Sequence, residues 1–454
     1  MAQTLLLQNA RLIDGLADQP REKVSILVTG ERIAAVEQDD LTPPADARVI
    51  DLKGKTVVPG LIDTHVHATL MGDDGLPLFL AAGVTSARDV GGKLEKVQQL
   101  KTDLNGGKKL GPRLFICGPL LDGADQSFEY SALTEMLDNI PSPEMVPQKI
   151  GELLAAGVDA VKLYFTLPPD TATAVIRFVD NRVPVTGHLG YTHSLDVIKA
   201  GINGLEHVWI SPYNEFCALD MQFGAGASMM DPKFWTKTLK GWEEADLQSR
   251  SARTWFDAMV EHQVNMGTTL DLLWIAKCGS EGIQHDPDRR YIPQPALARQ
   301  KAMATRIGER PDWDVHPGFF DPYQGGKALE KHQQVTRILH EAGGLVVGGT
   351  DCGALAYPPP GFALLREIEL LSEAIGSMSA LKAVTSVAAR YLRQQDNIGS
   401  VAPGRYADFL VIDGDPLRDP RELRKLTTVY RGGVAHDPQA LLARAPKSDA
   451  VHSQ

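Results

Sequence analysis

The sequence predicts an α/β protein, a (β/α)8 TIM barrel with a small β-sandwich domain built from the N- and C-terminal segments. Three observations support this prediction. The length of 454 residues exceeds what one hydrophobic core usually holds, so a large and a smaller domain are expected. Through the middle of the chain, apolar β-branched runs alternate with segments of helical spacing, which is typical of a parallel sheet covered by helices. At both ends, short alternating strands are separated by turns.

The predicted β-sandwich domain comprises residues 1–58 and 398–440. Its strand-like segments are TLLLQNARLIDG, KVSILVTGERIAAVE and ARVIDLKGKTVVPG near the start, and GSVAPGRYADFLVIDGDP and LTTVYRGGVAH near the end. We expect the two sets of strands to pair with one another. The remaining residues at the C-terminus, 441–454, have the composition of a flexible tail.

Residues 59–397 form the predicted barrel. In chain order, the eight candidate strands are VVPGLIDTHVH, GVTSARDV, PRLFICG, AVKLYF, VPVTGHL, GLEHVW, VNMGTTL and GLVVGGTDC. Segments with helical spacing, such as HSLDVIKAGI and GFALLREIELLSEAIG, lie between them. Eight strand–helix units fit a closed barrel, whose active site lies at the C-terminal ends of its strands.

Composition argues against several classes of function. The 46 Lys and Arg residues are outnumbered by 57 Asp and Glu residues, and the net charge of −11 gives no electrostatic reason to bind nucleic acid or an anionic membrane. The four cysteines contain no C-x-x-C pair, which fits reduced thiols better than a disulfide framework. No basic leader opens the chain and no apolar run is long enough to cross a bilayer, so we expect a soluble, cytoplasmic protein.

Side chains that can bind metal ions lie on five of the candidate strands. They are His65 and His67 on the first strand, Lys162 on the fourth, His188 on the fifth, His207 on the sixth and Asp351 on the eighth. Residues two apart on a strand share a face, so the first two histidines can point together into the barrel mouth. Taken singly, each residue could be a core histidine, a snorkelling lysine or a helix-capping aspartate. Their presence at one rim favours a metal site.

Two aromatic residues are candidates for substrate binding. Tyr164 lies two residues after Lys162, so its hydroxyl is expected to point into the mouth, with packing in the barrel wall as the alternative. Trp209 follows His207 with the same parity and is a candidate for lining the pocket. Arg88 could bind a carboxylate, but pairing with its neighbour Asp89 or with another strand is favoured.

The connections after the sixth and seventh candidate strands, within residues 211–330, are unusually long and rich in Trp, Phe, Tyr and Met. Long loops of this kind often act as lids or binding elements. Their composition favours a small-molecule substrate with a hydrophobic or aromatic portion. An oligomer interface is the alternative interpretation.

Several motifs together resemble the metal-dependent amidohydrolase superfamily, in its binuclear, carboxylated-lysine subtype, which includes imidazolonepropionases and prolidase-like dipeptidases. The motifs are PGLIDTHVH, VKLY, GHLG, GLEHV, GGTDCG and NIGSVAPGRYADFLVIDGDP, and they extend over nearly the whole chain. The resemblance implies a barrel with a small β-sandwich, and it implies a homo-oligomer, since this superfamily is often oligomeric.

The resemblance also implies a role for each candidate ligand. One metal ion would be held by His65, His67 and Asp351, and the second by His188 and His207. Lys162 would react with carbon dioxide and, as a carbamate, bridge the two ions. Zn²⁺ is the default ion, with Mn²⁺, Co²⁺ or Fe²⁺ as alternatives.

In the implied mechanism, a hydroxide shared by the two ions attacks the substrate carbonyl, and Asp351 carries the proton to the departing nitrogen. We therefore expect hydrolysis of a C–N amide bond in an N-acyl amino acid, an X-Pro-type dipeptide or an aryl amide. A lactonase or organophosphate-type esterase is the alternative within enzymes, because the same hydroxide attacks esters. A non-catalytic scaffold is disfavoured, because all six ligand positions are filled.

Overall fold

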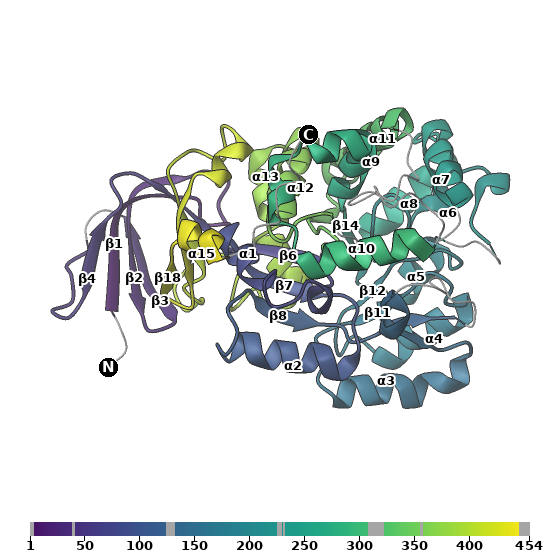
Figure 1. The fold of residues 1–454 in the computed structure, drawn as a ribbon, viewed down its shortest axis with the longest axis horizontal. Helices are drawn as coiled ribbons and strands as arrows, with labels where there is room; N and C mark the ends of the chain where they lie inside the picture. The colour runs from purple at the N-terminus through teal and green to yellow at the C-terminus, as the bar shows by residue number, and fades with distance from the viewer. Residues whose placement is uncertain are drawn as a thin grey trace.

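The computed structural model describes residues 4–38, 41–123, 132–224, 229, 232–306, 322–354 and 357–444. Figure 1 shows two parts side by side: a strand-rich domain, coloured purple and yellow because it combines both ends of the chain, and a larger body of helices around parallel strands. We call the first part the end domain. The second part is the barrel.

The end domain is one eight-stranded sheet made from both ends of the chain, as the sequence predicted. Its strands are β1 (Thr4–Leu12), β2 (Arg21–Thr29), β3 (Arg32–Gln38), β4 (Arg48–Asp51), β5 (Thr56–Pro59), β16 (Phe409–Ile412), β17 (Leu426–Arg431) and β18 (Val434–His436). The strand order is β18-β17-β16-β5-β1-β2-β3, with β4 paired to β1. The two halves join at the antiparallel pair β5/β16, where Val58 lies opposite Leu410.

The end domain has a hydrophobic core of its own. Leu5 and Leu7 on β1, and Val24 and Ile26 on β2, are spaced by two residues and therefore share one face of the sheet. Phe409 on β16 is fully buried in the same core and stacks on Tyr430, with 4.6 Å between the ring centroids.

The barrel is built from eight parallel strands, each of which lies within one of the eight candidate segments. They are β6 (Leu61–Val66), β7 (Val84–Asp89), β8 (Arg113–Ile116), β11 (Val161–Leu163), β12 (Val185–Gly187), β13 (Gly204–Glu206), β14 (Asn265–Gly267) and β15 (Leu345–Val347). The short strands β9 (Leu120–Asp122) and β10 (Leu137–Asn139) extend the sheet beside β11. Between β15 and β6, the amide of Thr64 donates to the carbonyl of Gly348 over 3.3 Å, and Val66 forms a bridge with Cys352.

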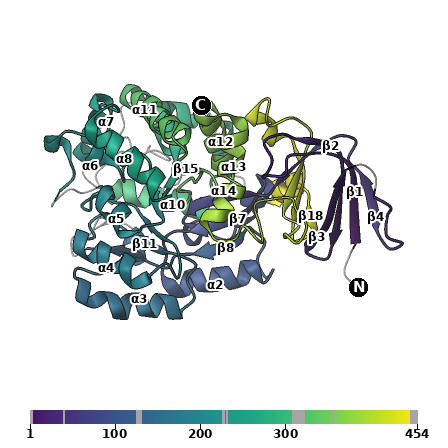
Figure 2. The ribbon, with the colours of Figure 1, turned by 180° about the vertical axis from the view of Figure 1, so that it is seen from behind.

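Helices cover the outside of the barrel, and Figure 2 shows α2 and α3 along the side opposite α11 and α12. The α-helices are α1 (Leu76–Ala81), α2 (Leu94–Asn105), α3 (Val146–Ala155), α4 (Pro169–Val179), α5 (Ser194–Ala200), α6 (Tyr213–Phe216), α7 (Pro232–Glu244), α8 (Arg250–Glu261), α9 (Leu270–Gln284), α10 (Gln294–Arg306), α11 (Pro322–Glu341), α12 (Phe362–Ile375), α13 (Ser377–Ala383), α14 (Ser386–Tyr391) and α15 (Pro438–Arg444). The 3₁₀ helices are η1 (Ala68–Leu70), η2 (Ala132–Met136), η3 (Pro143–Met145), η4 (Leu219–Met221), η5 (Pro287–Tyr291) and η6 (Pro420–Arg424). Of the helices in the described ranges, none has the length and apolarity needed to span a bilayer.

The first candidate strand differs from its prediction, because Gly60 divides it into two. The part before this residue, β5, belongs to the end domain, and the part after it, β6, belongs to the barrel. A Cβ atom on Gly60 would lie 2.1 Å from Oγ1 of Thr85 on β7, so glycine is required where the two domains meet.

The predicted tail begins inside a helix. Residues 441–444 form the last part of α15, which packs on the barrel core through Leu441. The rest of that segment, 445–454, lies outside the described residues.

We predict that Phe409→Ala lowers the free energy of unfolding of the end domain by about 3–5 kcal/mol, because it leaves a cavity in a core that joins both ends of the chain. Urea titration followed by circular dichroism measures the change. Val434→Ala on β18 is the control, since Val434 is 58% exposed and its truncation should change the free energy by less than about 0.5 kcal/mol. Equal effects of the two substitutions would contradict the assignment of Phe409 to the core.

Candidate metal centre

Three of the predicted ligands form a compact group at the barrel mouth. The Nε2 atoms of His65 and His67 lie 3.4 and 3.2 Å from Oδ1 of Asp351. One ligand atom from each residue can be chosen so that all three lie within 4.8 Å of one another. His65 lies on β6 and His67 directly follows its last residue, Val66, and both imidazoles reach Asp351.

The other two histidines lie next to this group. The ring of His207 is 4.5 Å from the ring of His65 and 4.4 Å from that of His188, measured between centroids. Its Nε2 atom lies 4.0 Å from Oδ2 of Asp351. The structure therefore brings together all four predicted histidines and the predicted aspartate, from the ends of β6, β12 and β13 and from the loop after β15, which ends at Val347.

Lys162 lies inside β11 and is 1% exposed. Among the described residues, its Nζ atom has no hydrogen-bond partner, and neither has the buried Nε2 atom of His188. Since buried polar atoms are almost always paired, these two atoms fit a site that holds a further group. Burial lowers the pKa of Lys162 to about 8, although the carboxylate of Glu206 partly opposes the shift. A fraction of this amine is therefore uncharged near neutral pH and able to act as a nucleophile.

Each of three histidines has a partner for its Nδ1 atom. His65 contacts Oε2 of Glu206 at 2.7 Å, His67 contacts the carbonyl oxygen of Gly91 at 3.0 Å, and His207 contacts Oγ1 of Thr269 at 2.9 Å. When Nδ1 donates its hydrogen to such an acceptor, the lone pair of Nε2 is left for a metal ion. The geometry therefore orients three imidazoles for coordination through Nε2.

The electrostatics of the group favour an ionised Asp351 and neutral imidazoles on His188 and His207. Burial lowers the pKa of His67, but its hydrogen bond with Asp351 outweighs this effect and raises the pKa overall. Burial raises the pKa of Asp351, but hydrogen bonds from His65 and His67 outweigh it, so the pKa lies well below its usual range. Burial holds the pKa values of His188 and His207 well below 6.5. Neutral imidazole and ionised carboxylate are the forms that bind divalent metal ions.

The predicted substrate-binding residues lie beside the ligands, although not on regular strands. β11 ends at Leu163 and β13 ends at Glu206, so strand parity does not position Tyr164 or Trp209. Tyr164 is 5.0 Å from the ring of His188, and burial raises the pKa of its hydroxyl well above 10.0. Trp209 is 5.4 Å from the ring of His207, and its Nε1 donates to Oγ1 of Thr269 over 3.2 Å.

The long connection after β13 contributes to this wall. Trp235 on α7 packs against Trp209, with 5.3 Å between the ring centroids. Within the next connection, Arg299 on α10 donates to the carbonyl oxygen of Leu70 over 2.6 Å and to that of Gly353, which follow β6 and β15. Both connections thus contact loops that carry ligands. Residues 307–321 of the second one lie outside the described residues.

Sequence reasoning missed two residues that orient the ligands, Glu206 and Thr269. Glu206 precedes His207, and adjacent residues on a regular strand point in opposite directions. His207 has a φ of 59°, which ends the alternation and lets both side chains face the barrel interior. The available signal was Arg88, a charged residue within the candidate strand GVTSARDV, because a buried arginine needs a carboxylate partner. In the structure, Nη2 of Arg88 donates to Oε1 of Glu206 over 2.5 Å instead of pairing with Asp89.

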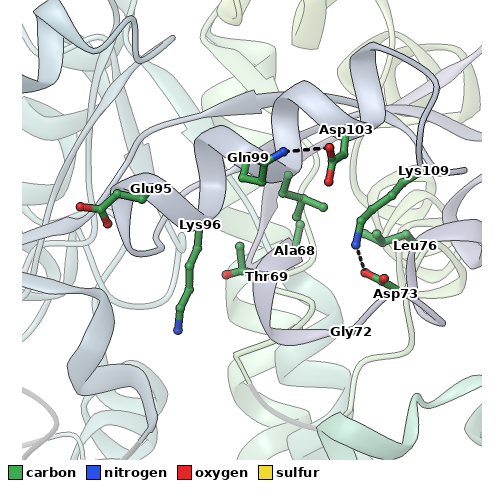
Figure 3. A pocket seen from close by; sticks show the side chains of 11 residues that line it. Ala68, Thr69, Gly72, Asp73, Leu76, Glu95, Lys96, Gln99, Asp103 and Lys109 are labelled. Atoms are coloured by element: carbon green, nitrogen blue, oxygen red, sulfur yellow. Dashed lines mark hydrogen bonds and ion pairs between the residues drawn. The ribbon is translucent and has the colours of Figure 1, made fainter.

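A pocket of about 400 Å³ lies beside the centre, between η1 and α2 (Figure 3). None of the six predicted ligand side chains lines it. Lys109 on its rim is paired with Asp73, as Figure 3 shows, and Lys96 contacts Glu135 at 2.9 Å. Lys109, Asp73 and Lys96 therefore already have ion-pair partners, and we do not assign this pocket to the chemistry.

Comparison with known proteins finds a family model and several relatives that resemble parts of this chain. The model of the Amidohydrolase family matches residues 292–435. An N-acyl-D-glutamate deacylase of Alcaligenes xylosoxydans xylosoxydans is 42% identical over 84 residues, which are 18% of this chain and only 17% of the relative. An imidazolonepropionase of Geobacillus sp. (strain WCH70) is 22% identical over 411 residues, 86% of this chain and 84% of the relative.

Solved structures agree with the fold. A Xaa-Pro dipeptidase with bound methionine in its active site has a TM-score of 0.67 at 19% identity, covering 96% of this chain and 100% of that one. A putative prolidase from Bifidobacterium longum has a TM-score of 0.66 at 22% identity, covering 98% and 99%. These likenesses concern the barrel and its end domain as a whole.

Another buried carboxylate, Glu367 on α12, supports the mouth without touching a ligand. It accepts hydrogen bonds from Oγ1 of Thr268 and, over 2.8 Å, from the amide of Asp271, so it anchors the end of β14. Burial raises the pKa of Glu367 from 4.5 to about 7, although both hydrogen bonds oppose the shift.

We predict that Glu367 makes the stability of the metal-free protein depend on pH. Because its folded-state pKa is raised, its contribution is fully present below pH 4.5 and is lost as the pH rises through about 7. The slope should reach at most about 1.4 kcal/mol per pH unit. In Glu367→Gln the fall in stability with pH should be smaller by this contribution, while Asp63 and Asp89, whose pKa values burial also raises, keep theirs. Urea titrations of both proteins between pH 5 and 8 measure the difference. Identical pH profiles would show that Glu367 is ionised throughout.

Proposed function

We propose that this chain is a binuclear metal-dependent hydrolase of C–N amide bonds and a member of the metal-dependent amidohydrolase superfamily. One observation carries the proposal: four imidazoles, a carboxylate and a buried lysine without a partner meet at one end of a barrel. The relatives named as a deacylase, an imidazolonepropionase and a Xaa-Pro dipeptidase support this type of bond.

We assign the six ligands to two ions. His65, His67 and Asp351 would hold one ion, His188 and His207 would hold the other, and a carbamate on Lys162 would bridge them. The desolvated, unpartnered amine supports the carbamate, because only an uncharged lysine reacts with carbon dioxide. Nitrogen and oxygen ligands suit Zn²⁺, and they also accept Mn²⁺, Co²⁺ or Fe²⁺.

Divalent ions at these ligands would supply Lewis acidity and lower the pKa of water towards neutrality. Side chains of the protein would then accept and deliver the proton. Asp351 is 16% exposed and ionised, so it can accept a proton from the attacking water and deliver it to the leaving nitrogen. Tyr164 keeps its hydroxyl hydrogen because its pKa is raised, and it can donate to the substrate carbonyl or carboxylate.

The aromatic wall supports a substrate with a hydrophobic or aromatic portion. Trp209 and Trp235 lie in contact beside His207, and large flat side chains favour apolar groups of similar size. N-acyl amino acids, X-Pro-type dipeptides and aryl amides all meet this requirement. The four cysteines are free thiols, which suits a reducing compartment such as the cytoplasm.

Metal removal tests the proposed function. The purified protein should contain about two divalent ions per chain and hydrolyse at least one member of a panel of N-acyl amino acids, X-Pro dipeptides and aryl amides. A chelator should abolish the activity, and Zn²⁺ or Mn²⁺ should restore it. Esters and lactones matched to the best amide measure the preference for the C–N bond. Activity that survives complete metal loss, or a protein that binds no metal, would reject the proposal.

A second prediction concerns Lys162. Lys162→Ala should lower kcat/KM by about 10³-fold or more and reduce the metal content, because the proposed bridge is lost. Lys199→Ala on α5 is the control, since Lys199 is an exposed lysine and its loss should change neither quantity. Carbon-13 NMR after addition of labelled bicarbonate should show a carbamate signal in the wild type only. Full metal content in Lys162→Ala would contradict the bridging role.

A further inference from the structure

Glu206 is the last residue of β13 and lies next to the proposed ligand His65. It is fully buried, and both carboxylate oxygens accept hydrogen bonds. Oε2 contacts Nδ1 of His65 at 2.7 Å. Oε1 accepts from Nη2 of Arg88 and Oγ1 of Thr186, each over 2.5 Å, and from the hydroxyl of Tyr391 over 3.1 Å. Five side chains from β6, β7, β12, β13 and α14 thus form one polar cluster.

Two glycines, Gly267 and Gly204, leave the space that this cluster occupies. A Cβ atom on Gly267 of β14 would lie 2.7 Å from Oε2 of Glu206, and one on Gly204 of β13 would lie 2.0 Å from the hydroxyl of Tyr391. The guanidinium of Arg88 lies 4.4 Å from the centroid of the Tyr391 ring, and its Nε donates to the carbonyl oxygen of Thr64 over 2.7 Å. Arg88 and Glu206 therefore have little freedom to move apart.

The cluster acts on the metal centre through the tautomer of His65. An imidazole that coordinates through Nε2 must carry its hydrogen on Nδ1, and an ionised carboxylate accepts that hydrogen more strongly than a neutral acceptor does. His67 and His207 have a carbonyl and a hydroxyl as their Nδ1 partners. Of these three histidines, only His65 has a carboxylate there.

We propose that Glu206 is a positioning residue that sets the metal affinity of the centre by holding His65 with Nδ1 protonated and Nε2 directed at the ion. Arg88 keeps the carboxylate in place by pairing with its other oxygen. This inference rests on the proposed function only in assuming that His65 is a ligand.

Glu206→Gln tests the inference, because the amide keeps the shape but presents either a donor to His65 or a donor to Arg88. Metal-free wild type and Glu206→Gln are each titrated with Zn²⁺ against a chelating indicator. We expect the dissociation constant for Zn²⁺ to be about 10–100-fold higher in Glu206→Gln than in the wild type. With Co²⁺, the visible absorption spectrum of the bound ion should also change. Asp408→Asn is the matched control: it also neutralises a buried carboxylate paired with an arginine, but Arg113 is the first residue of β8, at the opposite end of the barrel strands, so the wild-type affinity and spectrum should be kept.

A double variant separates positioning from charge balance. Arg88→Met alone leaves a buried carboxylate without its cation and should destabilise the fold, and adding Glu206→Gln should recover stability because both charges are then removed. Metal affinity should stay weak in the double variant. Wild-type affinity in either Glu206→Gln or the double variant would overturn the inference while leaving the proposed function intact. A wild-type protein that binds no metal would reject the proposed function instead.

Discussion

The need to pair charges away from water is the constraint on which the whole centre depends. An isolated ion in a protein interior costs several kcal/mol, so each buried charged group requires an opposite charge or strong hydrogen bonds. Here Arg88 opposes Glu206, and Asp351 is held by His65 and His67. The barrel supplies these partners from different strands, which is possible only because parallel strands end on the same side. The catalytic potential of the protein follows from that arrangement.

The fold and the grouping of the candidate ligands were accessible to sequence reasoning for a physical reason. Buried parallel strands are continuous apolar runs, and His65 and His67 follow such a run with a spacing of two, which gives them a common direction. The same logic located His188 and Asp351 at strand ends. It needs no knowledge of side-chain contacts, because the closure of the sheet converts positions at strand ends into neighbours in space.

Other features depend on local backbone conformations that a residue pattern does not reveal. His207 and Asp351 both have a φ of 59°, a left-handed conformation that non-glycine residues adopt only when their surroundings enforce it. This conformation is why Glu206 reaches the interior beside His207, and why parity arguments fail for Trp209. The requirement for glycine at position 60 could likewise not be predicted from the sequence, because it depends on the close approach of Thr85 from another strand.

The pairing of β5 with β16 has a consequence for biosynthesis. Val58 emerges from the ribosome long before Leu410, its partner in the sheet. Every barrel strand is translated between these two residues. The barrel can therefore begin to assemble while one edge of β5 is still unpaired, because β16 has not yet been made. Unpaired apolar edges attract other chains, and domains that close late spend longer in that vulnerable state. The end domain therefore completes its sheet only after β16 has been made.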